Sequence, residues 1–415
     1  MRRVLFAAHA CYFDDSNGAA VASRAMMEAL ARLGFIVEAL TGSALELHQG
    51  VDPTGWLTNR GISFQVSGDT SLSIDARGVR SNSPPHFRCR AGNVPVTLHC
   101  SPAIRSQAAC ASEYVEFLSL ADIVLDRLRP DVIVNFGGDN LAQEIRARAR
   151  ARGIAVVFAL HNFSYHAAAL FATADAVIVP SQFAADHYRK TLGLECTVLP
   201  NLIDFERVRA ITQDPRYVTF VNPSYEKGVY AYARIADELG RKRPDIPLLV
   251  VEGRGAERTL ADCGLDLRVH GNVSLMGHTH DPRLFWAVGR VCLMPSLWWE
   301  NQPLVAVEAM VNGIPVIGSD RGGIPEALGD AGIVLPLPDR LTPASRIVPE
   351  AEEVASWVEA IIRLWDDRAF YAEHQRRALA ESRRWSPEVL GPRYARFFEG
   401  LRRGRPTDQG AVREP

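Results

Sequence analysis

The chain has 415 residues, of which 47% are hydrophobic and 23% charged, as expected for a globular protein long enough for two domains. A net charge of −2 gives no general attraction to nucleic acid, and no segment approaches the roughly twenty apolar residues of a membrane span. The seven cysteines are scattered, which favours reduced thiols in the cytoplasm over a disulfide framework or a zinc site.

Strands and helices alternate in the first part of the chain. A strand over 4–8, a helix over 19–33 and a strand over 35–40 form a βαβ unit, which predicts a parallel sheet. Residues 51–102 are less regular. The other elements predicted up to residue 191 are strands over 62–66, 86–90, 94–98, 131–135, 154–160 and 174–180, and helices over 112–128, 140–152 and 183–191.

Alternation resumes after a linker at 205–217. The predicted strands are 218–221, 248–252, 291–294, 315–317 and 333–337, and the predicted helices are 230–239, 282–290, 304–311, 352–364, 368–384 and 387–402. The polar tail 403–415 is predicted to be disordered. This pattern indicates an α/β protein with two doubly wound parallel sheets, one in residues 1–205 and one in residues 206–386.

One stretch, residues 291–327, stands out chemically. Its strand ends at Pro295, and Pro303 opens an apolar helix whose one acidic residue is Glu308. A buried carboxylate is costly without a polar partner. Glu308 and the preceding loop residue Glu300 can both face the carboxyl ends of the strands, where parallel sheets bind ligands. Spacing alone leaves a solvated or salt-bridged Glu308 equally open.

The same stretch resembles the signature of the retaining glycosyltransferases of family four, which have the GT-B architecture. The matching residues are Pro295, Ser296, Glu300, Leu304, Val305, Glu308, Ala309, Met310, Gly313, Pro315, Val316, Ser319, Gly322, Gly323 and Glu326. The resemblance implies two Rossmann-like domains that face a cleft, with the last helix packing back on the first domain. Asn301-Gln302-Pro303 replaces the usual G-F-G, so we expect Asn301 to lie at the donor sugar.

The resemblance also implies roles for residues that bind a donor. Glu308 would hold the ribose hydroxyls, and Glu300 would hold hydroxyls of the donor sugar. Lys227, followed by glycine as in the family, would compensate the diphosphate together with the backbone N–H groups of Leu304 and Val305. The family's arginine before this lysine is missing, because Asn222 or Pro223 stands there. Arg254, in a loop after another strand, is our candidate substitute.

Further candidates come from other loops that resemble those of the family. Gly18 opens the first helix, in a loop that brings backbone N–H groups towards the diphosphate. His161 follows a strand at the position of a family histidine near the reacting sugar. Met276 and Gly277 would frame the nucleotide base, and Trp298 and Trp299 would either stack on a sugar or pack. His278 and His280 lack a clear third ligand, so zinc is not expected there.

Together these features predict a retaining glycosyltransferase that uses a UDP-, GDP- or other nucleotide-diphosphate sugar and needs neither metal nor cofactor. Residues 51–102 would face an acceptor of unknown identity. A nucleic-acid partner is not expected, and a peripheral membrane contact is not indicated. Two alternatives stay open: a nucleotide-sugar epimerase or hydrolase on the same frame, and a degenerate protein that binds nucleotide sugars without turnover.

Overall fold

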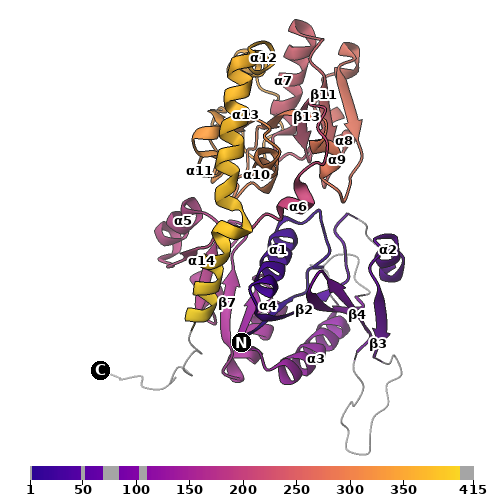
Figure 1. Cartoon of the computed structure of the whole chain (residues 1–415), viewed down its shortest axis with the longest axis vertical. Helices are drawn as coiled ribbons and strands as arrows, with labels where there is room; N and C mark the ends of the chain where they lie inside the picture. Colours follow the sequence, from indigo (N-terminus) through magenta and orange to yellow (C-terminus); the bar gives the residue numbers. More distant parts are fainter. Residues whose placement is uncertain (1, 48–51, 69–83, 102–109, 402–415) are drawn as a thin grey trace, which may run out of the picture. The chain divides into compact units, whose positions relative to one another are not determined.

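The computed structural model describes residues 2–47, 52–68, 84–101 and 110–401, so the predicted disordered tail lies outside the described residues. The chain divides into two compact units, which are labelled by element in Figure 1. The first unit contains Met1–Val179, Tyr188–Leu199 and Gly391–Pro415, and the second contains Pro180–His187 and Pro200–Leu390. This division gives the second unit two segments that the predicted boundary at residue 205 placed in the first domain.

The first unit is built on a nine-stranded sheet of order β3-β4-β5-β2-β1-β6-β7-β8-β9. Its strands are β1 (Arg3–Ala8), β2 (Ile36–Gly42), β3 (Phe64–Ser67), β4 (His86–Ala91), β5 (Val94–His99), β6 (Val132–Asn135), β7 (Ala155–Ala159), β8 (Ala176–Val179) and β9 (Thr197–Val198). All neighbours are parallel except β4, which is antiparallel to both β3 and β5. The three short strands predicted in the irregular region therefore extend the parallel sheet at one edge.

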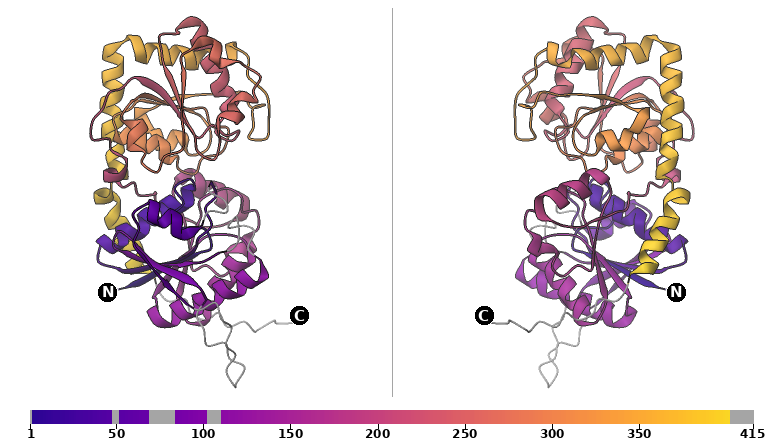
Figure 2. Two further views of the ribbon diagram at one scale, coloured as in Figure 1. Left: turned by 90° about the vertical axis from the view of Figure 1, so that its right-hand side faces the viewer. Right: turned by 90° about the vertical axis from the view of Figure 1, so that its left-hand side faces the viewer.

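Helices cover both faces of this sheet, as Figure 2 shows for α1 and α3. The helical elements are α1 (Gly18–Arg32), α2 (Pro53–Asn59), α3 (Ala111–Leu128), α4 (Asn140–Ala151), η1 (Ala168–Phe171), part of α5 (Gln182–Leu192) and most of α14 (Pro387–Gly400). The guanidinium of Arg2 donates to the carbonyl of Phe398 at 2.7 Å, and Arg393 donates to the carbonyl of Val198 at 3.1 Å. The last helix therefore ends on the first unit.

The second unit has a six-stranded sheet of order β12-β11-β10-β13-β14-β15, in which every neighbouring pair is parallel. Its strands are β10 (Tyr217–Val221), β11 (Leu248–Val251), β12 (Val273–Met276), β13 (Gly289–Met294), β14 (Val316–Ser319) and β15 (Ile333–Leu335). Its helical elements are α6 (Phe205–Val208), α7 (Val229–Lys242), α8 (Glu257–Ala261), η2 (Leu267–His270), α9 (Arg283–Trp286), α10 (Leu304–Val311), α11 (Ile324–Leu328), η3 (Gly329–Ala331), η4 (Glu352–Val354), α12 (Ala355–Asp366), α13 (Arg368–Ser382) and η5 (Arg383–Trp385).

Two predicted elements of the second unit were wrong in extent. The helix expected over 282–290 is the single turn α9, and β13 already begins at Gly289. A Cβ at Gly289 would lie 3.1 Å from Ile314 Cδ1, so this position suits a closely packed strand. The expected linker over 205–217 contains α6 and the first residue of β10. No helix among the described residues has both the length and the apolar character needed to cross a membrane.

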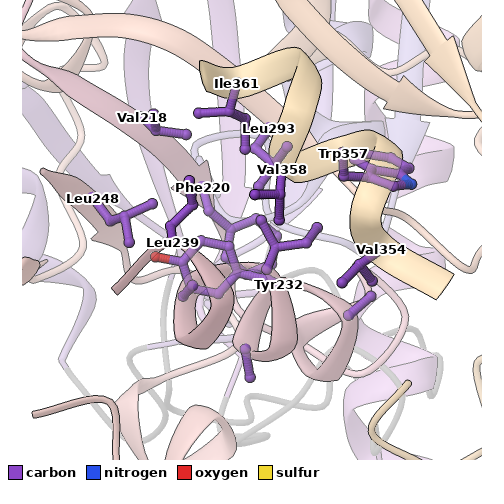
Figure 3. Packing of buried hydrophobic residues seen from close by; sticks show 14 of the residues in the cluster. Val218, Phe220, Tyr232, Leu239, Leu248, Leu293, Val354, Trp357, Val358 and Ile361 are labelled. Carbon is purple, nitrogen blue, oxygen red and sulfur yellow. The ribbon is translucent and has the colours of Figure 1, made fainter. Parts of the chain in front are cut away.

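The core of the second unit lies between its sheet and two helices. Strand residues Val218, Phe220, Leu248 and Leu293 pack against α7 and α12, as Figure 3 shows. The rings of Phe220 and Tyr232 stack with centroids 4.4 Å apart. The four central strands, β10, β11, β13 and β14, are parallel and mostly buried, so they appear as largely apolar runs in the sequence.

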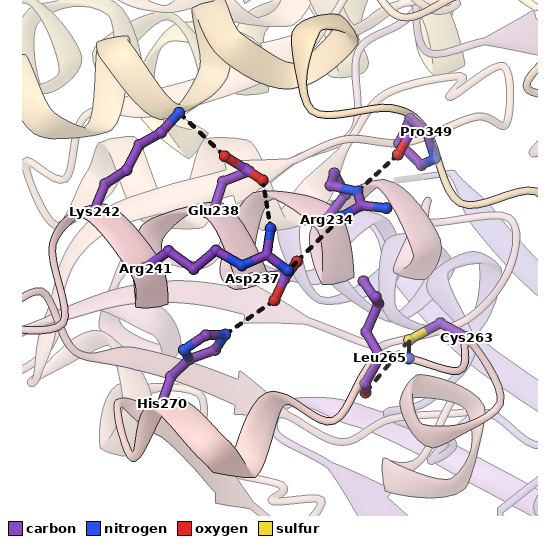
Figure 4. A network of polar contacts seen from close by, with 9 residues as sticks. All are labelled: Arg234, Asp237, Glu238, Arg241, Lys242, Cys263, Leu265, His270 and Pro349. Carbon is purple, nitrogen blue, oxygen red and sulfur yellow. Dashed lines mark hydrogen bonds and ion pairs between the residues drawn. The ribbon is translucent and has the colours of Figure 1, made fainter.

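A charged network holds η2 to α7 (Figure 4). The buried carboxylate of Asp237 lies 3.1 Å from a guanidinium nitrogen of Arg234, 2.7 Å from one of Arg241 and 2.9 Å from His270 Nε2. Glu238 pairs with Arg241 and Lys242. Since each buried carboxylate of this cluster has cationic partners, the network has a structural explanation and needs no ligand.

Candidate functional site

The predicted site residues of the second unit gather where the strand order reverses. β10 and β13 are neighbours in the sheet, and the connection after β10 leads to β11 on one side whereas that after β13 leads to β14 on the other. Such a topological switch point is where open parallel sheets bind ligands. The two loops that meet there are Asn222–Gly228, after β10, and Pro295–Pro303, after β13.

Lys227 and Glu300 form an ion pair across this switch point. Lys227 Nζ lies 2.5 Å from Glu300 Oε1, and Ser296 Oγ donates to the same carboxylate oxygen at 2.8 Å. The side chain of Lys227 is 26% exposed and that of Glu300 is 10% exposed. The sequence predicted both charged residues, and the structure brings them into direct contact. It also adds Ser296, a signature residue to which the sequence assigned no role.

Backbone contacts hold the two loops together. The carbonyl of Glu226 accepts hydrogen bonds from the backbone N–H groups of Leu297 (2.9 Å) and Trp298 (3.0 Å). Gly228 has a positive φ of 75°, and a Cβ at this position would collide with the carbonyl of Pro295. The glycine after Lys227 is therefore required both by backbone conformation and by the close approach of the second loop.

Replacing Gly228 by alanine is expected to destabilise the protein by more than the roughly 1–2 kcal/mol of a left-handed alanine, because the overlap with Pro295 adds to it. Urea unfolding measures this loss. Gly55→Ala is the matched control, since a Cβ at Gly55 meets nothing within 4 Å. Equal stability of the two variants would show that the loops are not held as described.

Two further glycines support Glu300 from the other side. A Cβ on Gly322 would overlap the backbone of Glu300, and one on Gly323 would overlap the carbonyl of Asn301. The N–H of Gly323 donates to the Glu300 carbonyl at 2.6 Å. The matching Glu326 serves a different purpose. Its carboxylate accepts from the N–H groups of Gln182 (2.8 Å) and Phe183 (2.9 Å), at the start of α5. The G-G-x-x-E part of the signature is therefore structural here.

Glu308 lies on α10 and has a tryptophan partner. Its Oε2 accepts a hydrogen bond from the indole N–H of Trp286 at 3.2 Å, and Trp286 is fully buried. Part of the Glu308 surface stays accessible, but protein surrounds the carboxylate. This desolvation raises the pKa of Glu308 to about 7, although the hydrogen bond from Trp286 opposes the rise. Glu308 is therefore about half protonated near neutral pH, which lowers the cost of its burial.

Arg254 lies in a loop that packs directly on the loop after β10. Asn222 has a positive φ of 62°, and its Oδ1 accepts from the N–H of Gly255 at 2.7 Å. A Cβ at Gly255 would collide with the backbone of Pro223, and one at Gly253 would lie 3.0 Å from Asn222 Cβ, a tight contact. Asn222, one of the two candidates for the position of the family's arginine, thus holds the loop that carries the exposed Arg254. Whether Arg254 replaces that arginine stays a prediction.

The departure from the family's G-F-G has a structural use. Asn301 Oδ1 accepts from Ser181 Oγ at 3.3 Å. Gln302 accepts from the backbone N–H of Asn201 at 2.8 Å and donates to its carbonyl at 3.2 Å. Asn301, Gln302 and Pro303 are all buried. The contact of Asn301 with a donor sugar stays a prediction, and its side chain already has a protein partner.

The start of α10 leaves two backbone donors at the switch point. The first intrahelical bonds run from the N–H groups of Ala306 and Val307 to the carbonyl of Pro303. The preceding N–H groups, on Leu304 and Val305, have no acceptor within the helix, as in the first turn of any helix. They retain the predicted ability to bind a phosphate.

The turn at Met276 and Gly277, predicted to frame the nucleotide base, follows β12, and Trp299 lies in the loop after β13. Met276 ends β12, and its carbonyl accepts from Glu252 N–H at 2.8 Å. A Cβ at Gly277 would meet nothing within 4 Å, so this turn is open on that side. Trp299 is 47% exposed and lies edge-on to Phe183 and His187, with ring centroids 5.9 and 5.4 Å apart. Of the two interpretations of Trp299, these contacts favour packing.

In the first unit, His161 follows β7 and contacts α1. Its Nε2 lies 3.3 Å from Ser23 Oγ, and its ring lies edge-on to Phe136 with centroids 5.3 Å apart. Burial lowers the pKa of His161 to about 4, so the imidazole is neutral at physiological pH. The neighbouring Asn162 contributes its carbonyl to a hydrogen bond from Tyr188 at 2.8 Å.

The loop at Gly18 has a local hydrogen-bond partner for its N–H groups, and its contact with a diphosphate stays a prediction. Asn17 caps α1, and its Oδ1 accepts from the N–H groups of Ala19 (2.9 Å) and Ala20 (3.3 Å). Two of the N–H groups expected to face a diphosphate are therefore already bonded. Asparagine is among the strongest N-cap residues, so this local contact competes with any ligand. Gly18 itself is exposed, and a Cβ at this position would meet nothing within 4 Å.

Comparison with known families covers most of the chain. Residues 16–207 match the family described as Glycosyltransferase Family 4, and residues 215–367 match that described as Glycosyl transferases group 1. A GDP-mannose-dependent monoacylated alpha-(1-6)-phosphatidylinositol monomannoside mannosyltransferase of Corynebacterium glutamicum is 25% identical over 252 residues, 54% of this chain and 62% of that protein. A phosphatidyl-myo-inositol mannosyltransferase of Mycolicibacterium smegmatis is 26% identical over 234 residues, 54% of this chain and 56% of that protein. The matches thus span less than two thirds of each relative.

Solved structures are similar over nearly the whole chain. Sucrose-phosphate synthase from Thermosynechococcus elongatus has a TM-score of 0.69 at 16% identity, covering 96% of this chain and 99% of that one. Anabaena Alr3699/HepE in complex with UDP-glucose has a TM-score of 0.64 at 17% identity, covering 97% of this chain and 100% of that one. At such identities the similarity concerns the fold.

Proposed function

Since this chain belongs to the group 1 glycosyltransferases and has their GT-B fold, we propose that it transfers a hexose from a nucleotide-diphosphate sugar to an acceptor hydroxyl with retention of configuration. The predicted family and fold class are both confirmed. The observation that carries the proposal is the Lys227–Glu300 pair at the switch point of the second unit. A cation that can bind a phosphate lies beside a carboxylate that can accept hydrogen bonds from sugar hydroxyls.

The ion pair suggests how the donor is bound. A diphosphate carries more negative charge than one carboxylate, so it competes for the partly exposed ammonium of Lys227. Once Lys227 turns to the phosphate, Glu300 is free to accept hydrogen bonds from sugar hydroxyls. Ser296 keeps the carboxylate in place during this exchange through its 2.8 Å hydrogen bond. Donor binding thus replaces one partner of each charged group by another.

The chemical step then follows from charge compensation. The acceptor hydroxyl oxygen bonds to the anomeric carbon on the face from which the diphosphate leaves, and its proton passes to a leaving phosphate oxygen. The carbon–oxygen bond to the phosphate breaks, and its electron pair stays with the nucleoside diphosphate. Lys227 and the N–H groups of Leu304 and Val305 stabilise this growing charge. Glu300 orients the sugar and is not a nucleophile.

The composition of the chain supports a specific role for Lys227. Of the 46 basic residues only three are lysines, at positions 190, 227 and 242, so arginine is used almost everywhere else. An ammonium is a compact point charge on a flexible stem, whereas a guanidinium prefers fixed, planar pairs. A lysine at 227 therefore suits a group that must change partners between carboxylate and phosphate.

The donor and the acceptor can be identified by a panel experiment. One relative of this chain is described as GDP-mannose-dependent, and a structural neighbour binds UDP-glucose, so both bases belong in the panel. We expect one class of nucleotide sugar to raise the melting temperature. We also expect nucleoside diphosphate release to increase when glycolipid or sugar acceptors are added. Nucleoside diphosphate release that is the same with and without every acceptor would instead indicate a hydrolase. Formation of an isomerised nucleotide sugar would indicate an epimerase.

A protein that binds nucleotide sugars without turnover is the second candidate. It is favoured by Asn222, which ties two loops together where the family has a diphosphate arginine. Saturable binding of a nucleotide sugar with no release in the presence of any acceptor would support this alternative.

Replacing Arg254 by alanine is expected to lower donor turnover by about 10²-fold, the order of effect seen when one stabilising donor is removed. Arg254→Lys should restore part of the rate. The control is Arg258→Ala, an exposed arginine on the adjacent α8. Initial rates of nucleoside diphosphate release measure all three. Normal turnover by Arg254→Ala would exclude Arg254 as the substitute for the missing arginine.

A further inference from the structure

Three buried side chains of the first unit, none of them a candidate site residue for the donor, lie close together. His9 follows β1, His99 ends β5, and Glu113 lies in the first turn of α3. They are 9%, 0% and 1% exposed, respectively. One ligand atom from each residue lies within 4.8 Å of those of the other two. The three residues stand at positions 9, 99 and 113 and form no short spacing motif, so the sequence did not indicate that they form a cluster.

The hydrogen bonds of this cluster leave two buried polar atoms unsatisfied. His9 Nε2 lies 2.9 Å from Glu113 Oε1, and Ser101 Oγ donates to the same oxygen. Glu113 Oε2 and His99 Nδ1 are both buried and have no hydrogen-bond partner among the described residues. An unsatisfied buried atom of this kind costs about 1–3 kcal/mol. Two such atoms in one cluster call for a partner that accepts electron pairs from both.

The surroundings favour a cation. His99 Nε2 lies 3.3 Å from Glu116 Oε2, so a carboxylate orients one ring nitrogen and leaves the other available. This is the arrangement by which proteins orient a histidine that binds a metal. The ring of Phe117 lies edge-on to both imidazoles, with centroids 5.2 Å from His9 and 5.7 Å from His99. An apolar wall of this kind excludes water and strengthens the attraction between a cation and its ligands.

We propose that His9, His99 and Glu113 bind one divalent transition-metal ion, by preference Zn²⁺. Two imidazoles and one carboxylate are a ligand set that zinc accepts, with a fourth position left for water. The ion binds Nδ1 of His99, an oxygen of Glu113 and Nε2 of His9. In doing so it joins β1, β5 and α3, and it stabilises the side of the first unit that the sequence assigned to the acceptor. No metal was expected from the sequence, and this site is independent of the proposed donor chemistry.

The geometry requires a small contraction. Two ligand atoms of tetrahedral zinc lie about 3.4 Å apart, since each is about 2.0–2.1 Å from the ion. The ligand atoms lie within 4.8 Å of one another, so no pair has to close by more than about 1.4 Å. His9 Nε2 and Glu113 Oε1 are 2.9 Å apart and must instead separate slightly. The hydrogen bond between His9 and Glu113 is given up when the metal takes its place.

Zinc titration of the full chain, produced without a polyhistidine tag, tests the proposal. We expect one Zn²⁺ per chain after gel filtration, measured by elemental analysis, and a rise in melting temperature of about 5 °C with excess zinc. Co²⁺ should give the visible absorption bands of a tetrahedral or five-coordinate site. Glu113→Gln should lower zinc affinity by at least 100-fold, and the control His278→Asn/His280→Asn should bind zinc as the wild type does.

Three outcomes would overturn the proposal. They are no stoichiometric zinc at micromolar concentrations, binding that survives Glu113→Gln, and binding that the His278→Asn/His280→Asn control abolishes. If Glu113→Gln does not fold, NMR of the wild-type chain labelled with ¹⁵N-histidine still tests whether the histidines bind zinc. Zinc must then shift the ring nitrogen signals of two histidines, identified through His9→Asn and His99→Asn, and an unchanged spectrum contradicts the site. Donor turnover is measured separately, so a failure here leaves the proposed function untouched.

Discussion

Lys227→Ala is expected to lower kcat/KM for the nucleotide sugar by about 10²–10³-fold, the effect of removing one preorganised donor from a developing anion. The loss follows from the position of Lys227 in the loop after β10, where its side chain is 26% exposed and its ammonium already lies close to an anion. Lys227→Arg should recover only part of the rate, because a guanidinium cannot take the same place beside Glu300 and Ser296. Initial rates of nucleoside diphosphate release give these values.

Two comparisons separate function from folding in this experiment. Lys227→Ala leaves the Glu300 carboxylate largely buried without its cation, which by itself destabilises the protein. The double variant Lys227→Ala/Glu300→Gln removes both charges, so it should fold normally and still be inactive. Lys190→Ala, an exposed lysine elsewhere, should keep wild-type activity. A single variant Lys227→Ala within about threefold of the wild-type rate would contradict the role of Lys227, since a lost donor costs far more.

Glu308→Gln is expected to stabilise the ligand-free protein, and increasingly so as the pH rises. The folded-state pKa of Glu308, about 7, lies above its ordinary value, so the folded protein holds a proton that the unfolded chain releases. Stability from this group is therefore full below the unfolded pKa and is lost as the pH rises through about 7. Glutamine avoids this loss. Each pKa unit corresponds to about 1.4 kcal/mol, and partial solvent access reduces the total, so we expect a gain of about 2 kcal/mol at pH 8.

The same variant should bind the donor nucleotide more weakly. Ribose hydroxyls donate to a carboxylate more strongly than to an amide oxygen, so the nucleoside diphosphate should lose about tenfold in affinity. Urea unfolding at pH 5 and pH 8 and calorimetric titration measure the two effects. Glu359→Gln, an exposed carboxylate on α12, should change neither. A stability gain that does not grow with pH would contradict the raised pKa, and unchanged affinity would remove Glu308 from the nucleotide site.

The order of strands and helices in both units could be predicted from the sequence, because buried parallel strands appear as short apolar runs between helical patterns. The meeting of Lys227 and Glu300 follows from that order. One residue comes after β10 and the other after β13, and these strands are neighbours in the sheet. Once a parallel sheet is predicted, the carboxyl ends of its central strands are the place to look for charged loop residues.

The side-chain partners of Glu308 and Gln302 could not be predicted from the strand order. Nothing near Glu308 in the sequence indicates that Trp286 will donate to it, and nothing near Gln302 indicates the backbone of Asn201 as its partner. These pairs depend on how the loops pack after the sheet has formed. A capping contact is local by contrast. Asn17 directly before a helix could have been read as the N-cap that occupies the N–H groups of Ala19 and Ala20.

The His9–His99–Glu113 cluster of the first unit could not be predicted from the sequence either. Each of these residues lies at the end of a strand or the start of a helix, where polar residues are common. Their convergence depends on β5 lying two strands from β1, with β2 between them. That order arises from the irregular region over 51–102, whose strands could be located from the sequence but not ordered.

The central claim is that Lys227 leaves its ion pair with Glu300 and binds the phosphates of a nucleoside diphosphate. It can be tested most directly by NMR of the lysine side chains. Only three lysines are present, so protein labelled with ¹³C at the lysine ε-carbons gives three signals, assigned through Lys→Arg variants. We predict that the nucleotide that stabilises the protein will shift the Lys227 signal saturably and leave those of Lys190 and Lys242 unchanged. A stabilising nucleotide that leaves the Lys227 signal in place would contradict the account.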